Sequence, residues 1–69
     1  MNNQELKRFQ SMVMGNDWDE SLIDKALSYA ETIEDRVNLR ALRAGFYTFQ
    51  MRMALQGFIN RIGAKNGNR

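Results

Sequence analysis

Cysteine, histidine and proline are all absent from the 69-residue sequence. The absence of cysteine excludes a disulfide framework, and the absence of both cysteine and histidine removes the usual ligands of a structural metal. A chain of this length buries only about 60% of its extended surface, so such domains often need a disulfide, a metal or a partner chain. Self-association is the option that remains, although many domains of this size fold as monomers.

The same absences remove most of the equipment of an enzyme. The chain has no histidine for acid–base chemistry near neutral pH, no cysteine nucleophile and no glycine-rich phosphate loop. The acids between residues 17 and 24 do not form a calcium loop, because Leu22 replaces the central glycine and Ser28 replaces the bidentate glutamate. We therefore expect a function in binding, with no catalytic residue, cofactor, metal ion or small-molecule substrate.

No hydrophobic run is long enough to span a membrane. The most apolar segment, residues 44–59, is interrupted by Gln50, Arg52 and Gln56 and is shorter than the roughly 20 apolar residues that a spanning helix needs. No apolar signal segment follows the charged N-terminal residues, and a cytoplasmic location fits a chain without cysteine. The composition, 43% hydrophobic and 26% charged, is that of a folded domain.

Charge divides the chain into an acidic middle and a basic end, although the formal net charge is only +2. Residues 17–35 carry seven acids against Lys25 alone, whereas residues 36–69 carry seven lysines and arginines and no acid. The two parts are able to neutralise each other within the fold or to attract partners of opposite charge.

Apolar periodicity predicts a short first helix, and the lack of proline favours helices throughout the chain. Leu6, Phe9 and Val13 recur at i, i+3 and i+7, which marks one side of a helix over residues 3–14. Gly15 is its expected stop, because glycine commonly follows the last helical residue. A helix of about three turns is marginal alone and must dock on another element.

The second predicted helix is acidic and amphipathic. Asp17 is its expected cap because a glutamate follows three residues later, so the helix begins at Trp18. Its apolar side contains Leu22, Ile23, Ala26, Leu27, Ala30 and Ile33. We expect a turn over residues 32–35, where Thr32 or Asp35 caps the next helix. These residues include no glycine or proline, so one continuous helix is not excluded by a helix breaker.

The third predicted helix, residues 36–62, carries apolar side chains on two nearly opposite flanks, and residues 63–69 form a flexible basic tail. One flank contains Leu39, Leu42, Phe46, Phe49 and Met53, and the other contains Met51, Leu55, Phe58 and Ile62. A hairpin within one chain covers only one flank, so we expect the second flank both to pack on the first helix and to form a homodimer interface. Gly45 and Gly57 mark either kinks or close helix contacts.

A basic stripe follows the third helix, with Arg36, Arg40, Arg43 and Tyr47 at i, i+4, i+7 and i+11. It is continued in phase by Gln50, Arg61 and Lys65. Such a row is able to follow a phosphate backbone, with Tyr47 stacking on a base, or to bind an acidic protein surface. The alternative is that the acids of the second helix neutralise the row within the fold.

Trp18 and Tyr47 are the best candidates for anchors in a protein interface, because an aromatic ring with a polar edge tolerates partial exposure. The chain also contains five methionines and four phenylalanines. Methionine repacks easily around a partner, so these side chains form either an adaptable binding surface or an ordinary core.

In length, in helical layout and in the stretch at residues 32–35 (Thr-Ile-Glu-Asp) followed by Leu39, the chain resembles the Hha-type nucleoid co-modulators of enteric bacteria. The aromatic, aspartate and histidine run of that family's third helix is absent, and residues 45–48 (Gly-Phe-Tyr-Thr) stand in its place. The resemblance therefore transfers no functional residue.

Together these patterns predict an all-α domain of three helices over residues 1–62 that forms a helical homodimer. The expected function is that of a small non-enzymatic binding or regulatory protein that acts on a larger protein partner. Two alternatives stay open: a nucleic-acid-binding protein that uses Arg36, Arg40 and Arg43, and a structural subunit of an assembly.

Overall fold

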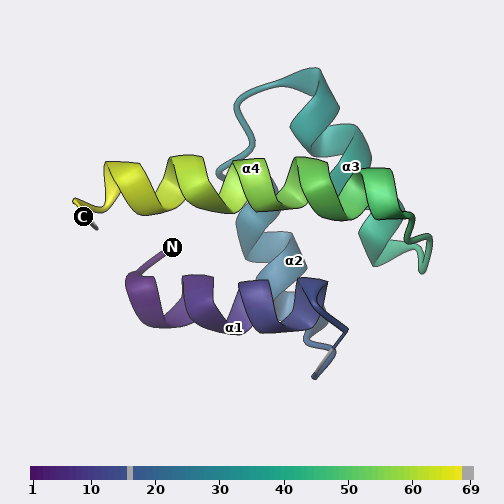
Figure 1. Ribbon diagram of the computed structural model, residues 1–69, viewed down its shortest axis with the longest axis horizontal. Coiled ribbons are helices and arrows are strands. Elements are labelled where there is room, and N and C mark those ends of the chain that lie inside the picture. The colour runs from purple at the N-terminus through teal and green to yellow at the C-terminus, as the bar shows by residue number, and fades with distance from the viewer. Residues whose placement is uncertain (16, 68–69) are drawn as a thin grey trace.

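The computed structural model describes residues 1–15 and 17–67, and that part of the chain forms four helices: α1 (Asn3–Val13), α2 (Glu20–Leu27), α3 (Ile33–Arg43) and α4 (Phe49–Lys65) (Figure 1). These residues form no strand, so the predicted all-α class is confirmed. The predicted number of three helices is wrong, because α3 and α4 replace the single third helix. Over the same residues, no helix combines the length and the apolar character needed to cross a membrane.

Gly45 makes the break between α3 and α4. It has a φ of 92°, a left-handed conformation that glycine adopts without strain. The amides of Gly45 and Phe46 donate to the carbonyl oxygens of Leu42 at 3.0 Å and Ala41 at 2.9 Å, which ends α3 in a Schellman motif. Thr48 then caps α4, because its hydroxyl accepts a hydrogen bond from a first-turn amide at 3.1 Å.

The starts of α2 and α3 test the predicted caps. Thr32, one of the two candidate caps, caps α3, and its hydroxyl accepts from a backbone amide of the first turn at 3.0 Å. Helix α3 therefore begins at Ile33, three residues before the predicted start at residue 36. Helix α2 is capped by Asp19 rather than by Asp17, so it begins two residues later than predicted. The carboxylate of Asp19 accepts from both the amide (3.0 Å) and the hydroxyl (2.6 Å) of Ser21, and these two bonds fix the first turn there.

Helix α4 extends to Lys65, three residues beyond its expected end at Ile62. Gly63 is buried, so the first residues of the predicted tail belong to the packed part of the helix. Just after the helix, the side-chain amide of Asn66 donates to the carbonyl oxygen of Met1 at 2.7 Å. Residues 68–69 of the predicted tail lie outside the described residues.

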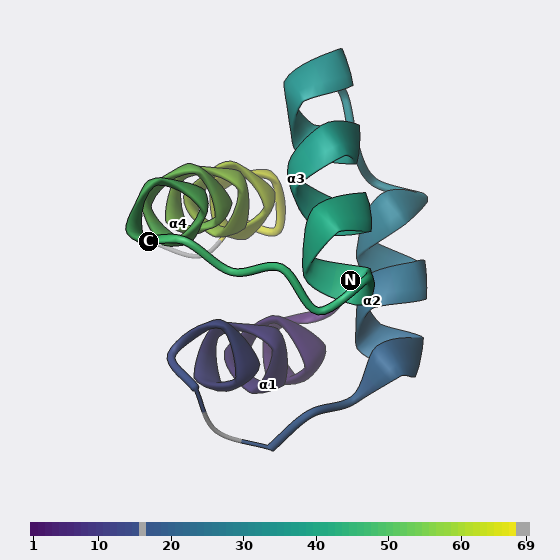
Figure 2. The same ribbon diagram turned by 90° about the vertical axis from the view of Figure 1, so that its right-hand side faces the viewer.

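The helices form two pairs that cross each other. Helices α1 and α4 run antiparallel side by side, and α2 and α3 form a second antiparallel pair that crosses them (Figures 1 and 2). One core lies between the pairs and contains Met1, Leu6, Phe9, Met12, Val13, Leu22, Ile23, Ala26, Leu39, Leu42, Leu55, Phe58, Ile59 and Ile62. Within it the rings of Phe9 and Phe58 meet edge to face, with their centroids 6.3 Å apart.

The residues predicted for a dimer interface belong to this core. Leu55, Phe58 and Ile62 are each at most 3% exposed in the single chain, and Met51 packs against the same cluster. Their assignment to a dimer interface is therefore wrong, because contacts within one chain already cover them. The other prediction for this flank, packing on the first helix, agrees with the contact of α4 with α1.

The opposite predicted flank is split by the break. Leu39 and Leu42 of α3 are buried as expected. The side chains of Phe46, Phe49 and Met53 were also expected inside, but they are 68%, 72% and 61% exposed. The helical phase does not continue through Gly45, so residues on the two sides of the break no longer share a face.

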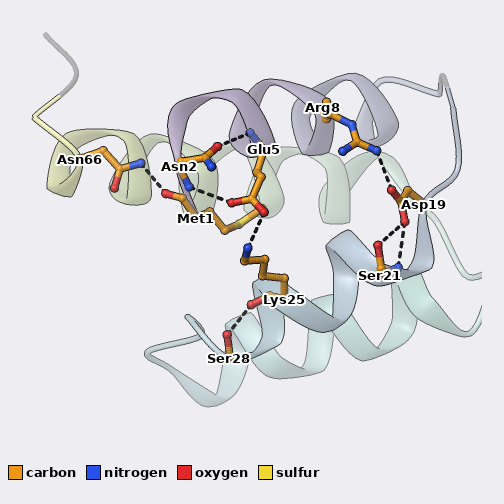
Figure 3. Close-up of polar contacts among 9 residues, drawn as sticks. All are labelled: Met1, Asn2, Glu5, Arg8, Asp19, Ser21, Lys25, Ser28 and Asn66. Atoms are coloured by element: carbon orange, nitrogen blue, oxygen red, sulfur yellow. Dashed lines mark hydrogen bonds and ion pairs between the residues drawn. The ribbon is translucent and has the colours of Figure 1, made fainter.

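Polar contacts fasten α1 to its neighbours (Figure 3). Its start is closed by a capping box, in which the Glu5 amide donates to the Asn2 side chain at 2.8 Å and the Asn2 amide donates to the Glu5 carboxylate at 3.0 Å. The same carboxylate pairs with Lys25 of α2, and Arg8 pairs with Asp19 at 2.7 Å. These contacts orient α1 across α2, while the core supplies most of the stabilisation.

Replacing Gly45 by alanine tests the break. Alanine is strained at a φ of 92°, so Gly45→Ala is expected to lower the free energy of unfolding by about 1–2 kcal/mol. Gly57→Ala is the control, because Gly57 lies inside α4 and no atom lies within 4 Å of the position that its Cβ would take. The control is expected to gain up to about 1 kcal/mol. Denaturant unfolding at low protein concentration measures the free energy of unfolding of both variants. A change of the same sign in the two variants would contradict the role of Gly45.

Candidate interaction surface

Three cations of the predicted basic stripe are neutralised within the chain. Their partners all come from the acidic middle of the sequence, but only Arg43 is held by acids of α2, as the alternative predicts for the whole row. The pairs are Arg43 with Asp24 (2.6 Å) and Glu20 (3.3 Å), Arg61 with Asp35 (2.6 Å), and Lys65 with Glu31 (2.5 Å). The stripe is also divided in space, because its members lie on two different helices.

The pair of Asp35 and Arg61 is the most buried of these contacts. The Asp35 carboxylate accepts from the Arg61 guanidinium at 2.6 Å and from the Glu31 amide at 3.3 Å. Burial raises the pKa of this carboxyl, but the hydrogen bonds from Arg61 and Glu31 outweigh burial, and the pKa is lowered from 3.8. The Arg61 guanidinium also lies 5.9 Å from the centre of the Phe58 ring. Arg61 therefore joins α4 to α3 and is occupied within the fold.

Tyr47 and Trp18, the predicted anchors, differ in their surroundings. The Tyr47 hydroxyl donates to the carbonyl oxygen of Val13, which ties the connection between α3 and α4 to the end of α1. Close by, the Arg52 guanidinium lies 2.9 Å from the sulfur of Met14. Trp18 lies in the segment before α2 and is about half exposed. Tyr47 thus has a structural role, and its ring is only partly open to solvent.

Arg36 and Arg40 differ from the rest of the stripe, because neither pairs with a carboxylate of the described residues. They share the outer side of α3 with Ile33 and Val37, whose side chains are 78% and 59% exposed. At about 100° per residue, the four positions fall within roughly a third of the helix circumference, opposite its buried side. We call Ile33, Arg36, Val37 and Arg40 the α3 flank.

The apolar periodicity of the sequence does not predict that Ile33 and Val37 share an exposed side of one helix. Ile33 is in phase with the apolar side of the predicted second helix, but the structure places it at the start of α3. Val37 follows four residues later, on the side opposite Leu39 and Leu42. The i, i+4 spacing of these two aliphatic residues identifies the flank once the turn before Thr32 is recognised.

The α3 flank offers hydrophobic contact together with hydrogen bonds from two guanidinium groups. Among the described residues, no three His, Cys, Asp or Glu side chains gather as they would around a metal ion. The chain matches no family model, and no curated protein or solved structure is significantly similar to it. Function is therefore inferred from the geometry and chemistry of the surface.

Removing Arg61 is expected to destabilise the chain more than removing Arg43. Arg61→Ala leaves the carboxylate of Asp35 buried without its cation, which costs about 1–3 kcal/mol of unfolding free energy. Arg43→Ala removes ion pairs whose side chains are exposed, so a smaller effect is expected. Thermal or denaturant unfolding of the two variants makes the comparison, and a larger loss for Arg43→Ala would contradict the structural role of Arg61.

The lowered pKa of Asp35 makes stability depend on pH. A carboxyl whose pKa is lower in the folded chain than its usual 3.8 favours folding when it is ionised. That contribution is complete above the pKa of the unfolded chain and is lost as the pH falls through the lower folded-state pKa. We expect the unfolding free energy to decrease below about pH 4 and Asp35→Asn to weaken this decrease. An identical pH dependence in the variant would contradict the prediction.

Proposed function

We propose that the protein is a small, non-enzymatic intracellular regulator that binds a larger protein partner through the α3 flank. The observation that carries the proposal is the juxtaposition of Arg36 and Arg40, which pair with no carboxylate of residues 1–15 and 17–67, with the exposed side chains of Ile33 and Val37. The complementary surface presents acidic side chains beside an apolar patch. The partner is thus defined by its chemistry.

The two halves of the α3 flank contribute differently to such a complex. Burial of an exposed valine or isoleucine side chain stabilises an interface by about 1.5–3 kcal/mol. Arg36 and Arg40 provide specificity, because a guanidinium group forms paired hydrogen bonds with a carboxylate. Helix α3 is capped by Thr32 at its start and by the Schellman motif at its end, so its backbone is already ordered. Binding therefore costs little additional backbone entropy.

A nucleic acid fits this flank less well. Affinity for a phosphate backbone grows with the number of cations that contact it, and strong binders commonly use about 6–10 such contacts. Arg43, Arg61 and Lys65 are already paired with carboxylates, which leaves Arg36 and Arg40 of the predicted stripe. The exposed side chains of Ile33 and Val37 make no hydrophobic contact with a phosphate group. A protein surface uses both halves of the flank.

Affinity capture from the native host tests the proposal with Val37→Glu as the decisive variant. Its control is Gln4→Glu, which adds the same charge to α1, a helix that does not contact α3. Both positions are exposed, so both variants are expected to fold, which circular dichroism verifies. We expect one protein to be retained by the wild-type and control chains and lost with Val37→Glu. Equal retention by all three chains would contradict the proposal.

Salt and nuclease distinguish the remaining alternatives in the same experiment. We expect capture to survive nuclease treatment and to weaken when Arg36 and Arg40 are both replaced by glutamine. Loss of capture after nuclease treatment, with binding to a DNA duplex that falls steeply as salt rises, would favour the nucleic-acid alternative. Large homo-oligomers that capture no other protein would favour a structural subunit.

A further inference from the structure

A second exposed surface lies on α4 and is separate from the α3 flank. It consists of Phe49, Met53, Gly57, Asn60 and Ala64, which we call the α4 flank. At about 100° per residue these positions fall within roughly 80° of the helix circumference, and none of them is charged. The cations at the C-terminal end of α4, Arg61 and Lys65, are held by acids on the side of α3.

Large and small side chains occupy opposite ends of the α4 flank. Phe49 and Met53 project into solvent near the start of the helix. Asn60 and Ala64 lie near its end, where they line a groove between α1 and α4 with a volume of about 420 Å³. Leu6 and Ile59 also line this groove, so part of it is apolar. The chain therefore carries both a projecting apolar pair and a hollow on the same side of one helix.

Gly57 lies midway between the two ends and is not explained by contacts within the chain. It has no positive φ, and no atom lies within 4 Å of the position that its Cβ would take. Glycine inside a helix costs about 1 kcal/mol relative to alanine. A second backbone that approaches the helix at this point would account for the missing side chain.

We propose that the α4 flank binds the α4 flank of a second copy of the chain, with the two helices antiparallel and a two-fold axis passing beside Gly57. The spacing of the residues determines the register. The two-fold axis crosses the helices between residues 56 and 57, so a residue before this point lies opposite the residue of the other copy that is equally far after it. Phe49 then lies opposite Ala64, and Met53 lies opposite Asn60 of the other copy. Each projecting pair enters the groove of the other copy, and the contact is isologous.

The antiparallel arrangement is the one that the α4 flank favours. A parallel pair would bring Phe49 of the two copies together and leave both grooves unfilled. The five residues of the flank are uncharged and do not repel their copies, while Lys7 is the one charged residue that lines the groove. Antiparallel helix dipoles also attract weakly. The α3 flank remains open in this dimer, so the inference does not depend on the proposed function.

Sedimentation of the purified chain over a range of concentrations tests the dimer. We expect a monomer–dimer equilibrium in which Met53→Glu raises the dissociation constant at least tenfold. Val37→Glu is the matched control, because it also replaces an exposed apolar side chain with glutamate, and it should leave the constant unchanged. A wild-type chain that stays monomeric up to about 1 mM, where even millimolar affinity would be visible, would overturn the inference. Equal effects of the two variants would overturn it as well.

Crosslinking tests the register, because the chain contains no cysteine. Gly57→Cys is expected to form a disulfide-linked dimer on mild oxidation, since the two copies of this position meet at the axis. Ala64→Cys is the control, because the proposed register separates its two copies by about 22 Å along the helices. Faster crosslinking of Ala64→Cys than of Gly57→Cys would contradict the antiparallel register.

Discussion

The break at Gly45 determines which side of α4 faces the core, and the rest of the architecture depends on it. The left-handed conformation of this glycine ends α3, and Thr48, five residues after the last residue of α3, starts α4 in a new direction. The Tyr47 hydroxyl holds the connection against the end of α1. As a result, Leu55 and Phe58 enter the core, while the opposite side of α4 is left in solvent.

The acidic middle of the chain neutralises three cations of the basic end. Arg43 is held by two acids of α2, Arg61 by Asp35 of α3, and Lys65 by Glu31 in the turn before α3. Of these pairs, only Asp35–Arg61 contains a buried carboxylate, so it contributes more to the fold than the exposed pairs do. Among the described residues, the arginines of the α3 flank pair with none of these acids, and they share their side of the helix with two exposed aliphatic side chains.

Local signals in the sequence predict the end of α1 and offer the correct cap of α3 as one of two candidates, because a cap or a stop glycine acts within one turn. Thr32 is such a signal, and Gly15 is another. Periodicity fails where it is extended through Gly45, since a continuous helical phase places Phe49 inside and Phe58 in a dimer interface. Whether a glycine kinks a helix or ends it depends on the tertiary contacts that follow. The candidate surface is predicted in part: the arginines are found, but the exposure of Val37 depends on how α3 packs.

The side of α4 that meets α1 is therefore the central structural claim, and the aromatic rings report on it directly. Nuclear Overhauser effects in a ring-labelled sample measure which phenylalanine lies near Phe9. The account predicts strong contacts between the rings of Phe9 and Phe58, and none between Phe9 and Phe49. Contacts of Phe9 with Phe49 in place of Phe58 would show that the other side of α4 faces the core, and would contradict it.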